Sequence, residues 1–382
     1  MAQPPLERKD ENVSNRIRAV VFSGAEAPLE VTEVKLEPPG PAEVRVRIAA
    51  AGVCHSDLHV LRGEWELPLP LVMGHEGAGV VTELGPNVTE LELGDHVVLC
   101  WQPACRRCRF CQAGYPSQCE LVARVVAPGG VLYDGTSRLS RDGQRIHHYL
   151  GVSSFAEEAV VPETGAIRIR RDMPLDRAAL VGCCVATGVG AVLRTARVEE
   201  GSTAVVIGCG AVGLSAIQGA VIASSSRIVA VDLLEHKLET AARLGATDLV
   251  NASKADPVEA VRDLTGGGAD YVFDAIGLPA TTEQAVQMLG LGGTAVVVGL
   301  PPTGARASFE PLVLAEAEQR ILGSNYGSVR PAIDFPLLVD LDLSGRLRID
   351  ELITGHRPLA EVNEAFEDLV AGRAIRTILE PL

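Results

Sequence analysis

The clearest chemistry in this sequence is carried by four cysteines in one short segment, CRRCRFCQAGYPSQC. The segment places Cys105, Cys108, Cys111 and Cys119 in the spacing C-x2-C-x2-C-x7-C. Four thiolates at this spacing predict a closed tetrahedral zinc site, which has no open coordination position for a substrate. We therefore predict a structural role, with an iron–sulfur cluster as the alternative because its cysteine ligands can have similar spacing.

A second set of metal-ligand residue types is spread over three separate segments of the chain. The segments are GVCHSDLH with Cys54, GHEGAG with His75 and Glu76, and GCCVATG with Cys183 and Cys184. A catalytic zinc needs about three protein ligands and one open position. One cysteine, one histidine and one further cysteine would supply the ligands, and the residue types alone leave Cys183 and Cys184 as alternatives.

A glycine-rich turn predicts a dinucleotide cofactor. Gly208, Gly210 and Gly213 form G-x-G-x-x-G between the apolar run TAVVI and a run of helical length. The first glycine permits a tight turn, the second lets a pyrophosphate approach the backbone, and the third packs helix against strand. Asp232 ends the next apolar run, where a carboxylate binds both ribose hydroxyls and repels a 2′-phosphate, and Leu233 rather than an arginine follows it. The sequence therefore predicts NAD rather than NADP.

The elements that must position these residues change type along the chain. Up to about Val161, short runs such as EVRVRIA and DHVVLCW are bounded by Gly, Pro and Asp, which indicates a compact, barrel-like β domain. From about Val185, strand and helix patterns alternate, which favours an α/β fold with a doubly wound parallel sheet. The predicted domains are a catalytic domain of residues 1–184, completed by 325–382, and a nucleotide-binding domain of residues 185–324.

Composition limits the class of protein and its partners. A chain of 382 residues is long for one core and favours two domains. The formal net charge of −15 argues against nucleic acid and anionic membranes as main partners. No apolar run is expected to reach membrane-spanning length, and the N-terminal MAQPPLERKDENVSNR, which lacks the apolar region of a secretory signal, predicts a mobile tail. Nine cysteines without such a signal predict reduced thiols, metal binding and a cytoplasmic location.

Taken together, the motifs resemble those of the zinc-dependent medium-chain alcohol dehydrogenases, over nearly the whole chain from about Ile17 to Leu382. The motifs that carry the resemblance are GVCHSDLH, GHEGAG, the four-cysteine segment, GCCVATG, VIGCGAVG, VVVGLPP and AIRTIL. DGTSRLSRDGQRIHHYLG resembles the long loop of the dimeric animal-type enzymes. The resemblance implies a GroES-like β-rich catalytic domain, a Rossmann NAD-binding domain, an active site between the two, and a homodimer formed through the edge of the nucleotide sheet.

The resemblance also assigns metal ligands. The ligands of the catalytic zinc would be Cys54, His75 and Cys183. With the four-cysteine site, this gives two Zn²⁺ per chain. The family pattern in the third segment is Gly-Cys-Gly, so Cys184 stands where a glycine is usual. Glu76 would act close to the metal or as a transient ligand, and Asp57 would accept the free ring N–H of His75 and fix its tautomer.

The reaction that the resemblance implies is hydride transfer from a zinc-bound alkoxide to the nicotinamide of NAD. Ser56 and His59 match the family's proton relay, in which the cofactor ribose lies between the hydroxyl and the histidine. Further cofactor contacts would come from Lys237, Val298 and Arg376. His55 is a departure, because the animal enzymes often have arginine there, at the pyrophosphate. A histidine predicts a weaker pyrophosphate contact and faster NADH release.

Three aromatic residues match positions that line the family's substrate pocket: Trp65, Trp101 and Tyr149. They favour primary alcohols that are aromatic or of medium chain length, and the corresponding aldehydes. A first alternative is a thiol-adduct formaldehyde dehydrogenase that oxidises an S-hydroxymethyl thiol, for which Arg124 and Arg138 are candidate partners of the thiol's carboxylate. A second is a non-catalytic NAD-binding regulatory protein, which would have no chemical need for the ligand and relay residues.

Overall fold

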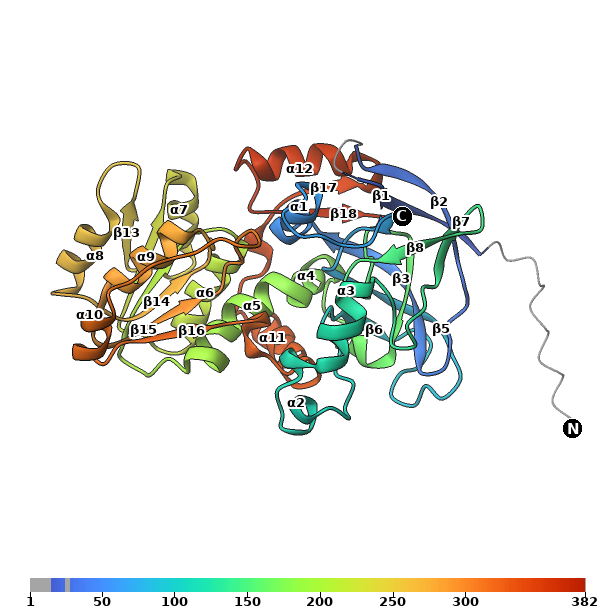
Figure 1. Cartoon of the computed structure of the whole chain (residues 1–382), viewed down its shortest axis with the longest axis horizontal. Helices are drawn as coiled ribbons and strands as arrows, with labels where there is room; N and C mark the ends of the chain where they lie inside the picture. Colours follow the sequence, from blue (N-terminus) through green and yellow to red (C-terminus); the bar gives the residue numbers. More distant parts are fainter. Residues whose placement is uncertain (1–14, 25–27, 382) are drawn as a thin grey trace, which may run out of the picture.

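The computed structural model describes residues 15–24 and 28–381 of the chain, so most of the predicted N-terminal tail lies outside the described residues. These residues form an elongated molecule with a β-rich part at one end and a parallel sheet covered by helices at the other (Figure 1). The predicted α/β fold class is confirmed.

The β-rich part contains two sheets. The first is a closed barrel of β1 (Arg16–Phe22), β2 (Glu30–Leu36), β7 (Leu139–Arg141), β8 (Gln144–His148) and β4 (Leu71–Val72). The second has seven strands: β10 (Ala166–Arg168), β6 (His96–Leu99), β5 (Gly77–Leu84), β3 (Glu43–Gly52), β18 (Arg376–Glu380) and β17 (Ile353–Pro358), with β9 (Glu158–Pro162) also paired to β3.

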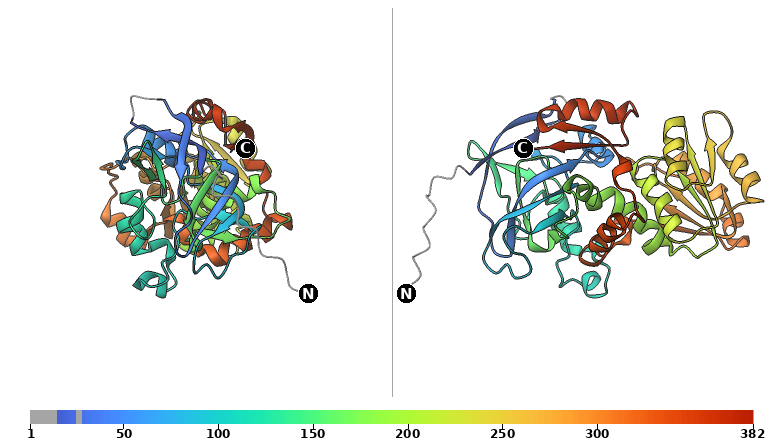
Figure 2. Two further views of the ribbon diagram at one scale, coloured as in Figure 1. Left: turned by 90° about the vertical axis from the view of Figure 1, so that its right-hand side faces the viewer. Right: turned by 180° about the vertical axis from the view of Figure 1, so that it is seen from behind.

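The C-terminal strands complete the second sheet. β18 pairs antiparallel with β3, with Ile378 opposite Gly52, and β17 pairs parallel with β18. From behind, the C-terminal segment, in red, can be followed back to the β-rich part (Figure 2). This pairing is compatible with a catalytic domain built from both ends of the chain. The boundaries at residues 184 and 325 stay predictions.

The parallel sheet has the strand order β13 (Asp248–Asn251), β12 (Arg227–Asp232), β11 (Thr203–Ile207), β14 (Ala269–Asp274), β15 (Leu289–Val297) and β16 (Arg320–Gly323). Alternate residues of its strands belong to different apolar clusters. Val206 packs in one with α6 (Ala211–Ile222) and α7 (Glu235–Arg243), and Val205 packs in another with α8 (Pro257–Thr265) and α9 (Pro279–Gln287). Helices therefore cover both faces, which explains why the strands are nearly continuous apolar runs. Helix α10 (Pro311–Glu316) also belongs to this part of the chain.

A long helical stretch, Leu175–Ala196, connects the two parts and contains α4 (Leu175–Leu180) and α5 (Ala186–Gly190). The expectation that no apolar stretch reaches membrane-spanning length is wrong, because this one passes by length and composition. However, 78% of its most apolar window is buried inside the protein, as in the core helix of a globular fold. The remaining helices are α1 (His55–Leu61), α2 (Arg109–Gln112), α3 (Ala127–Gly129), α11 (Pro331–Leu343) and α12 (Val362–Val370).

Candidate active site and metal centres

Three ligand-type side chains from separate segments meet in the protein interior. Cys54 lies at the start of α1, His75 in the loop between β4 and β5, and Cys183 in a π-helical turn after α4. Their ligand atoms all lie within 4.8 Å of one another, and all three residues are buried. The His75 Nε2 is 3.3 Å from the Cys183 Sγ. Two sulfurs and one imidazole nitrogen at this spacing fit a zinc ion with one tetrahedral position left open.

The structure distinguishes the two neighbouring cysteines. Successive residues of a helix point roughly 100° apart, so only one of the pair can face Cys54 and His75. That residue is Cys183. The Cys184 Sγ lies 3.8 Å from a carboxylate oxygen of Glu76 and 3.6 Å from the Leu180 carbonyl oxygen. Burial raises the pKa of the Cys184 thiol, which favours its neutral form.

Asp57 connects two of the three ligand-type residues. One of its carboxylate oxygens lies 3.2 Å from the His75 Nδ1, and the other accepts a hydrogen bond of 3.2 Å from the Cys54 backbone N–H. Burial alone would lower the pKa of His75, but the Asp57 carboxylate outweighs it and raises that pKa to about 10. With Nδ1 directed at Asp57, the Nε2 of a neutral His75 ring faces Cys183, which is the arrangement that the family resemblance implied.

Glu76 and Arg376 form a buried ion pair beside Gly52 and Val53, the two residues before Cys54. The Glu76 carboxylate packs against Gly52, where a Cβ atom would lie only 2.2 Å from Glu76 Oε1. Burial raises the pKa of Glu76 to about 7, although the Arg376 guanidinium opposes that change. The Arg376 Nε is 3.5 Å from Glu76 Oε1, and its Nη1 donates a 2.5 Å hydrogen bond to the Val53 carbonyl. Arg376 is thus held by the protein at the start of the segment that carries Cys54.

The predicted relay residues lie on one face of α1. Ser56 and His59 are three positions apart, which places their side chains on the same face of a helix. The phenol of Tyr149 donates a 2.9 Å hydrogen bond to the Ser56 carbonyl. Its ring meets the His75 ring edge-on, with centroids 5.4 Å apart. Tyr149 therefore connects the α1 relay face to one of the three ligand-type residues.

The other two predicted pocket aromatics have partners of their own. The Trp65 ring stacks on His59 with centroids 4.5 Å apart, and its indole N–H donates 3.3 Å to the Pro301 carbonyl. Trp101 stacks on Tyr326 at 4.1 Å. Sequence reasoning missed Tyr326, whose hydroxyl donates to the Gly182 carbonyl, directly before Cys183. Its one sequence signal is an isolated aromatic residue after the last apolar run of the nucleotide domain.

The glycine-rich turn has the geometry that a pyrophosphate needs. Gly208 has φ +93°, a left-handed conformation, and a Cβ atom there would lie 2.5 Å from Ile276. A Cβ on Gly213 would lie 1.7 Å from the Gly208 carbonyl oxygen, so this glycine permits the close contact of helix and strand. A Cβ on Gly210 would meet nothing within 4 Å. The turn is thus open at the N-terminus of α6, where phosphate groups bind.

Further predicted cofactor residues surround this turn. Asp232 accepts a 2.7 Å hydrogen bond from the Cys209 backbone N–H and so fixes the turn to the end of β12. Partial desolvation, together with the positive charges of Arg376 and Lys237, lowers the pKa of His55. Lys237 and Arg376 therefore act on the same end of α1. Val298 is buried directly after β15 and donates 3.0 Å to the Asp274 carbonyl, at the carboxyl end of the sheet where dinucleotides bind.

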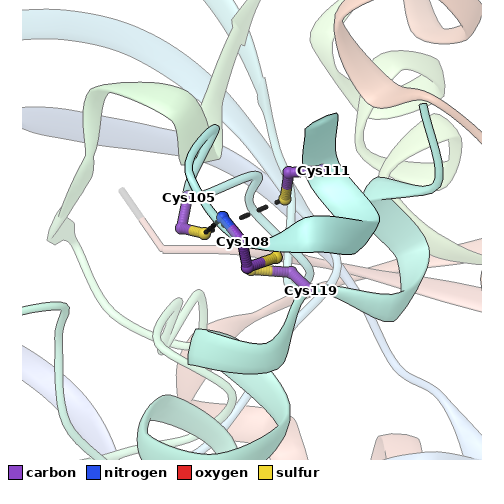
Figure 3. Close-up of side chains that lie close together, drawn as sticks. All are labelled: Cys105, Cys108, Cys111 and Cys119. Atoms are coloured by element: carbon purple, nitrogen blue, oxygen red, sulfur yellow. Dashed lines mark hydrogen bonds between the residues drawn. The ribbon is translucent and has the colours of Figure 1, made fainter. Parts of the chain in front are cut away.

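The four predicted structural ligands are also brought together. The sulfur atoms of Cys105, Cys108, Cys111 and Cys119 all lie within 4.8 Å of one another (Figure 3). Donation by the Cys111 backbone N–H lowers the pKa of Cys108 to about 6, which favours the thiolate form that binds metal. The surrounding apolar cluster is small, with Val122 and Val126 as its other buried members. The four-thiol set fits a closed zinc site that would stabilise residues 105–126, which we call the four-cysteine lobe.

The two arginines considered for a thiol-adduct substrate already have carboxylate partners. Arg124 is exposed and lies 3.3 Å from Glu120. Arg138 lies 2.7 Å from Glu43 and 2.7 Å from Asp134. Both guanidinium groups are therefore already paired with carboxylates of the protein.

Comparison with known proteins gives matches over both parts of the chain. Residues 40–171 match the family model of the alcohol dehydrogenase GroES-like domain, and residues 211–342 match that of the zinc-binding dehydrogenases. A probable S-(hydroxymethyl)glutathione dehydrogenase 1 of Schizosaccharomyces pombe is 40% identical over 95% of this chain and 96% of its own. A class-3 alcohol dehydrogenase of Drosophila melanogaster is 40% identical over 95% and 97%.

Solved structures agree with this result. The benzyl alcohol dehydrogenase of Acinetobacter calcoaceticus superimposes with a TM-score of 0.91 at 36% identity, covering 96% of this chain and 99% of its own. An alcohol dehydrogenase zinc-binding domain protein of Burkholderia ambifaria gives a TM-score of 0.92 at 39% identity, covering 96% and 98%. The likeness therefore extends over nearly the whole chain and includes both sheets.

Proposed function

Since this chain belongs to the zinc-dependent, NAD-linked medium-chain alcohol dehydrogenases, we propose that it oxidises primary alcohols, aromatic or of medium chain length, to aldehydes, and catalyses the reverse reaction. The observation that carries this proposal is the buried group of Cys54, His75 and Cys183, with the aromatic ring of Tyr149 against His75. Zinc supplies a Lewis acid at such a site and NAD accepts the hydride.

In this proposal the chain's own residues have three tasks: they hold the metal, orient its ligands and transfer a proton. Cys54, His75 and Cys183 would hold the metal, and Asp57 orients Cys54 and His75 through the contacts described above. Ser56 would take up the alcohol proton at its hydroxyl oxygen, and His59 would receive a proton at a ring nitrogen on the same face of α1. The His59 side chain is 20% exposed, so it can release the proton to solvent.

The substrate class rests on the aromatic residues. Trp65, Trp101 and Tyr149 offer flat apolar surfaces, which suit an aromatic or slender alcohol. The name of the Acinetobacter relative refers to benzyl alcohol. The names of other relatives refer to S-(hydroxymethyl)glutathione, which makes the thiol-adduct reaction the second candidate. The ion pairs of Arg138 favour the first candidate, because its largely buried guanidinium already has Glu43 and Asp134 as partners and is not free for a thiol's carboxylate.

NADH formation by the purified protein tests both candidates. We expect turnover with NAD and benzyl alcohol that exceeds turnover with ethanol, is lost after chelation of zinc, and falls when NADP replaces NAD. The matched reaction contains formaldehyde with and without a low-molecular-weight thiol. Turnover that requires the thiol, without turnover of benzyl alcohol, would replace the first candidate by the second.

Replacement of His55 by arginine is expected to strengthen NADH binding about tenfold, because a guanidinium forms charge-assisted hydrogen bonds to a pyrophosphate that a neutral ring cannot form. If NADH release limits the rate, kcat should fall by a similar factor. Fluorescence titration with NADH measures the affinity, and His55→Gln is the matched control without the new charge. An unchanged NADH affinity in His55→Arg would contradict a pyrophosphate contact at this position.

We also propose a cytoplasmic homodimer that forms through the edge of the parallel sheet. Within the described residues β16 pairs only with β15, so its other edge is open. Leu291, Leu312 and Val313 are exposed apolar residues of β15 and α10, the neighbouring elements. An open edge with apolar neighbours is a typical dimer surface. Sedimentation at the mass of a single 40.2 kDa chain would contradict this proposal.

A further inference from the structure

We propose that Glu64 is a positioning residue for the proton acceptor His59. Its carboxylate accepts a hydrogen bond from the N–H at Nδ1 of His59, and this leaves the lone pair on Nε2 free to take up a proton. This inference rests on the relay role proposed for His59 and deepens it. It adds a residue whose position in the sequence carries no signal of its own.

The turn after α1 brings Glu64 back to His59. Gly63 follows the helix with φ +68°, a left-handed conformation that ends helices and that glycine adopts without strain. Its backbone N–H donates 3.0 Å to the Val60 carbonyl. The chain then reverses, and the backbone N–H groups of Glu64 and Trp65 both donate to the His59 carbonyl, at 2.9 Å and 3.4 Å. The main chain alone therefore places the next two side chains beside the His59 ring.

Those two side chains hold the ring in different ways. The Glu64 carboxylate contacts the His59 Nδ1 directly. The Trp65 ring stacks on the imidazole with an angle of 21° between the planes. Trp65 is in turn held by its hydrogen bond to the Pro301 carbonyl, which belongs to the nucleotide-binding part of the chain. The rotation and the plane of the imidazole are thus both fixed.

The chemistry of the pair fixes the tautomer. An ionised carboxylate can only accept hydrogen bonds, so the hydrogen of the neutral ring lies on Nδ1 and the lone pair on Nε2. Among the described residues no group hydrogen-bonds the Nε2. A proton that arrives at Nε2 creates an imidazolium whose second N–H already faces a negative charge. The same logic orients a histidine base beside a carboxylate in hydrolases.

The proton can then leave without a change of fold. The Glu64 side chain is 26% exposed and the His59 side chain 20% exposed, so both reach water. The proton that enters at Nε2 is balanced by loss of the Nδ1 proton to Glu64 or to solvent, and the ring returns to its starting tautomer by exchange with water. No oxidant, reductant or further group is needed.

The test compares Glu64→Gln with Glu66→Gln in the full-length, zinc-loaded protein. Both variants remove one carboxylate from the same loop, but Glu66 is exposed, and among the described side chains it is Glu64 that contacts the His59 ring nitrogen. A glutamine amide can accept from Nδ1 or donate to it, so it no longer dictates one tautomer. The tautomer is read from the ¹⁵N chemical shifts of histidine-labelled protein, with the His59 signals assigned from their absence in His59→Gln.

We expect the Nδ1–H form of His59 in the unchanged protein and in Glu66→Gln, and a mixture of tautomers in Glu64→Gln. We also expect kcat to fall about tenfold in Glu64→Gln, a part of the ~100-fold that general acid–base catalysis supplies, with KM for NAD unchanged. Glu64→Asp should recover most of the rate. An Nε2–H tautomer in the unchanged protein would overturn the proposal.

Kinetics of His59→Gln separate this inference from the proposed function. If His59→Gln lowers kcat strongly while Glu64→Gln changes neither kcat nor the tautomer, the relay stands and the role of Glu64 is refuted. If His59→Gln keeps full activity, the relay itself is refuted, and the role of Glu64 with it. A fall in kcat that Glu64→Asp does not recover, with an equal change in KM for NAD, indicates a purely structural role and also overturns the proposal.

Discussion

Replacement of Cys183 by serine is expected to remove one zinc ion per chain and to lower kcat/KM for alcohol oxidation about a thousandfold, since ~4 kcal/mol of lost transition-state stabilisation corresponds to that factor. The reason is geometric. The Sγ atom of Cys183 lies within 4.8 Å of the Cys54 sulfur and the His75 ring nitrogen, so it is one of the three proposed ligands around the position proposed for the alcohol. A serine hydroxyl is a harder and weaker ligand than a thiolate and would not hold zinc in its place.

Cys184→Ala is the matched control for this experiment. Cys184 is adjacent in sequence and also buried, but its sulfur faces Glu76 and the Leu180 carbonyl rather than the other two ligand-type residues. The alanine variant should keep its zinc content, and its kcat/KM should stay within about threefold of the unchanged protein because a small apolar replacement leaves most of the packing intact. Metal analysis and NADH rates on both variants decide the matter. Loss of zinc from Cys184→Ala, with zinc retained in Cys183→Ser, would reverse the ligand assignment.

The same pair of residues marks the limit of sequence reasoning at this site. Local spacing was sufficient to predict that the four cysteines lie together and that the glycine-rich segment forms a turn, because residues a few positions apart can be arranged in few ways. The choice between Cys183 and Cys184 required a direction in space, which the residue types do not contain and only the family resemblance supplied. The helix around them settles that direction, since one residue of the pair must point away.

Other features depend on contacts between distant segments. Tyr326 follows a strand of the nucleotide sheet, but it stacks on Trp101 of the β-rich part, and no periodic pattern connects the two. Glu64 reaches His59 only because Gly63 reverses the chain. The helical stretch Leu175–Ala196 also depends on distant contacts. Arg177 and Arg194 flank its apolar run, and in the fold they pair with Asp342 and Asp334 of α11.

Substitution in the four-cysteine lobe is expected to affect stability more than chemistry. Cys108→Ser should remove one zinc ion per chain and lower Tm by roughly 10 °C, the scale of losing several kcal/mol in a protein of this size. The lobe has only a small apolar cluster of its own, so we expect cross-linking by a metal to be its main source of order. Differential scanning calorimetry and metal analysis measure the two effects, and Arg107→Ala, an exposed residue of the same loop, is the control.

Loss of zinc from the four-cysteine lobe should also affect the active site, because a chain of contacts connects the two. The side chain of Asn325 donates a 2.9 Å hydrogen bond to the Ser117 carbonyl inside the lobe. Tyr326, the next residue, stacks on Trp101 and donates to the carbonyl before Cys183. An unfolded lobe would release Asn325 and loosen this aromatic pair, so KM for an aromatic alcohol should rise severalfold while KM for NAD stays nearly constant. A Cys108→Ser protein that keeps two zinc ions and its melting temperature would show that the lobe needs no metal. A variant with a lower Tm and unchanged KM values would show instead that the lobe and the alcohol site are independent.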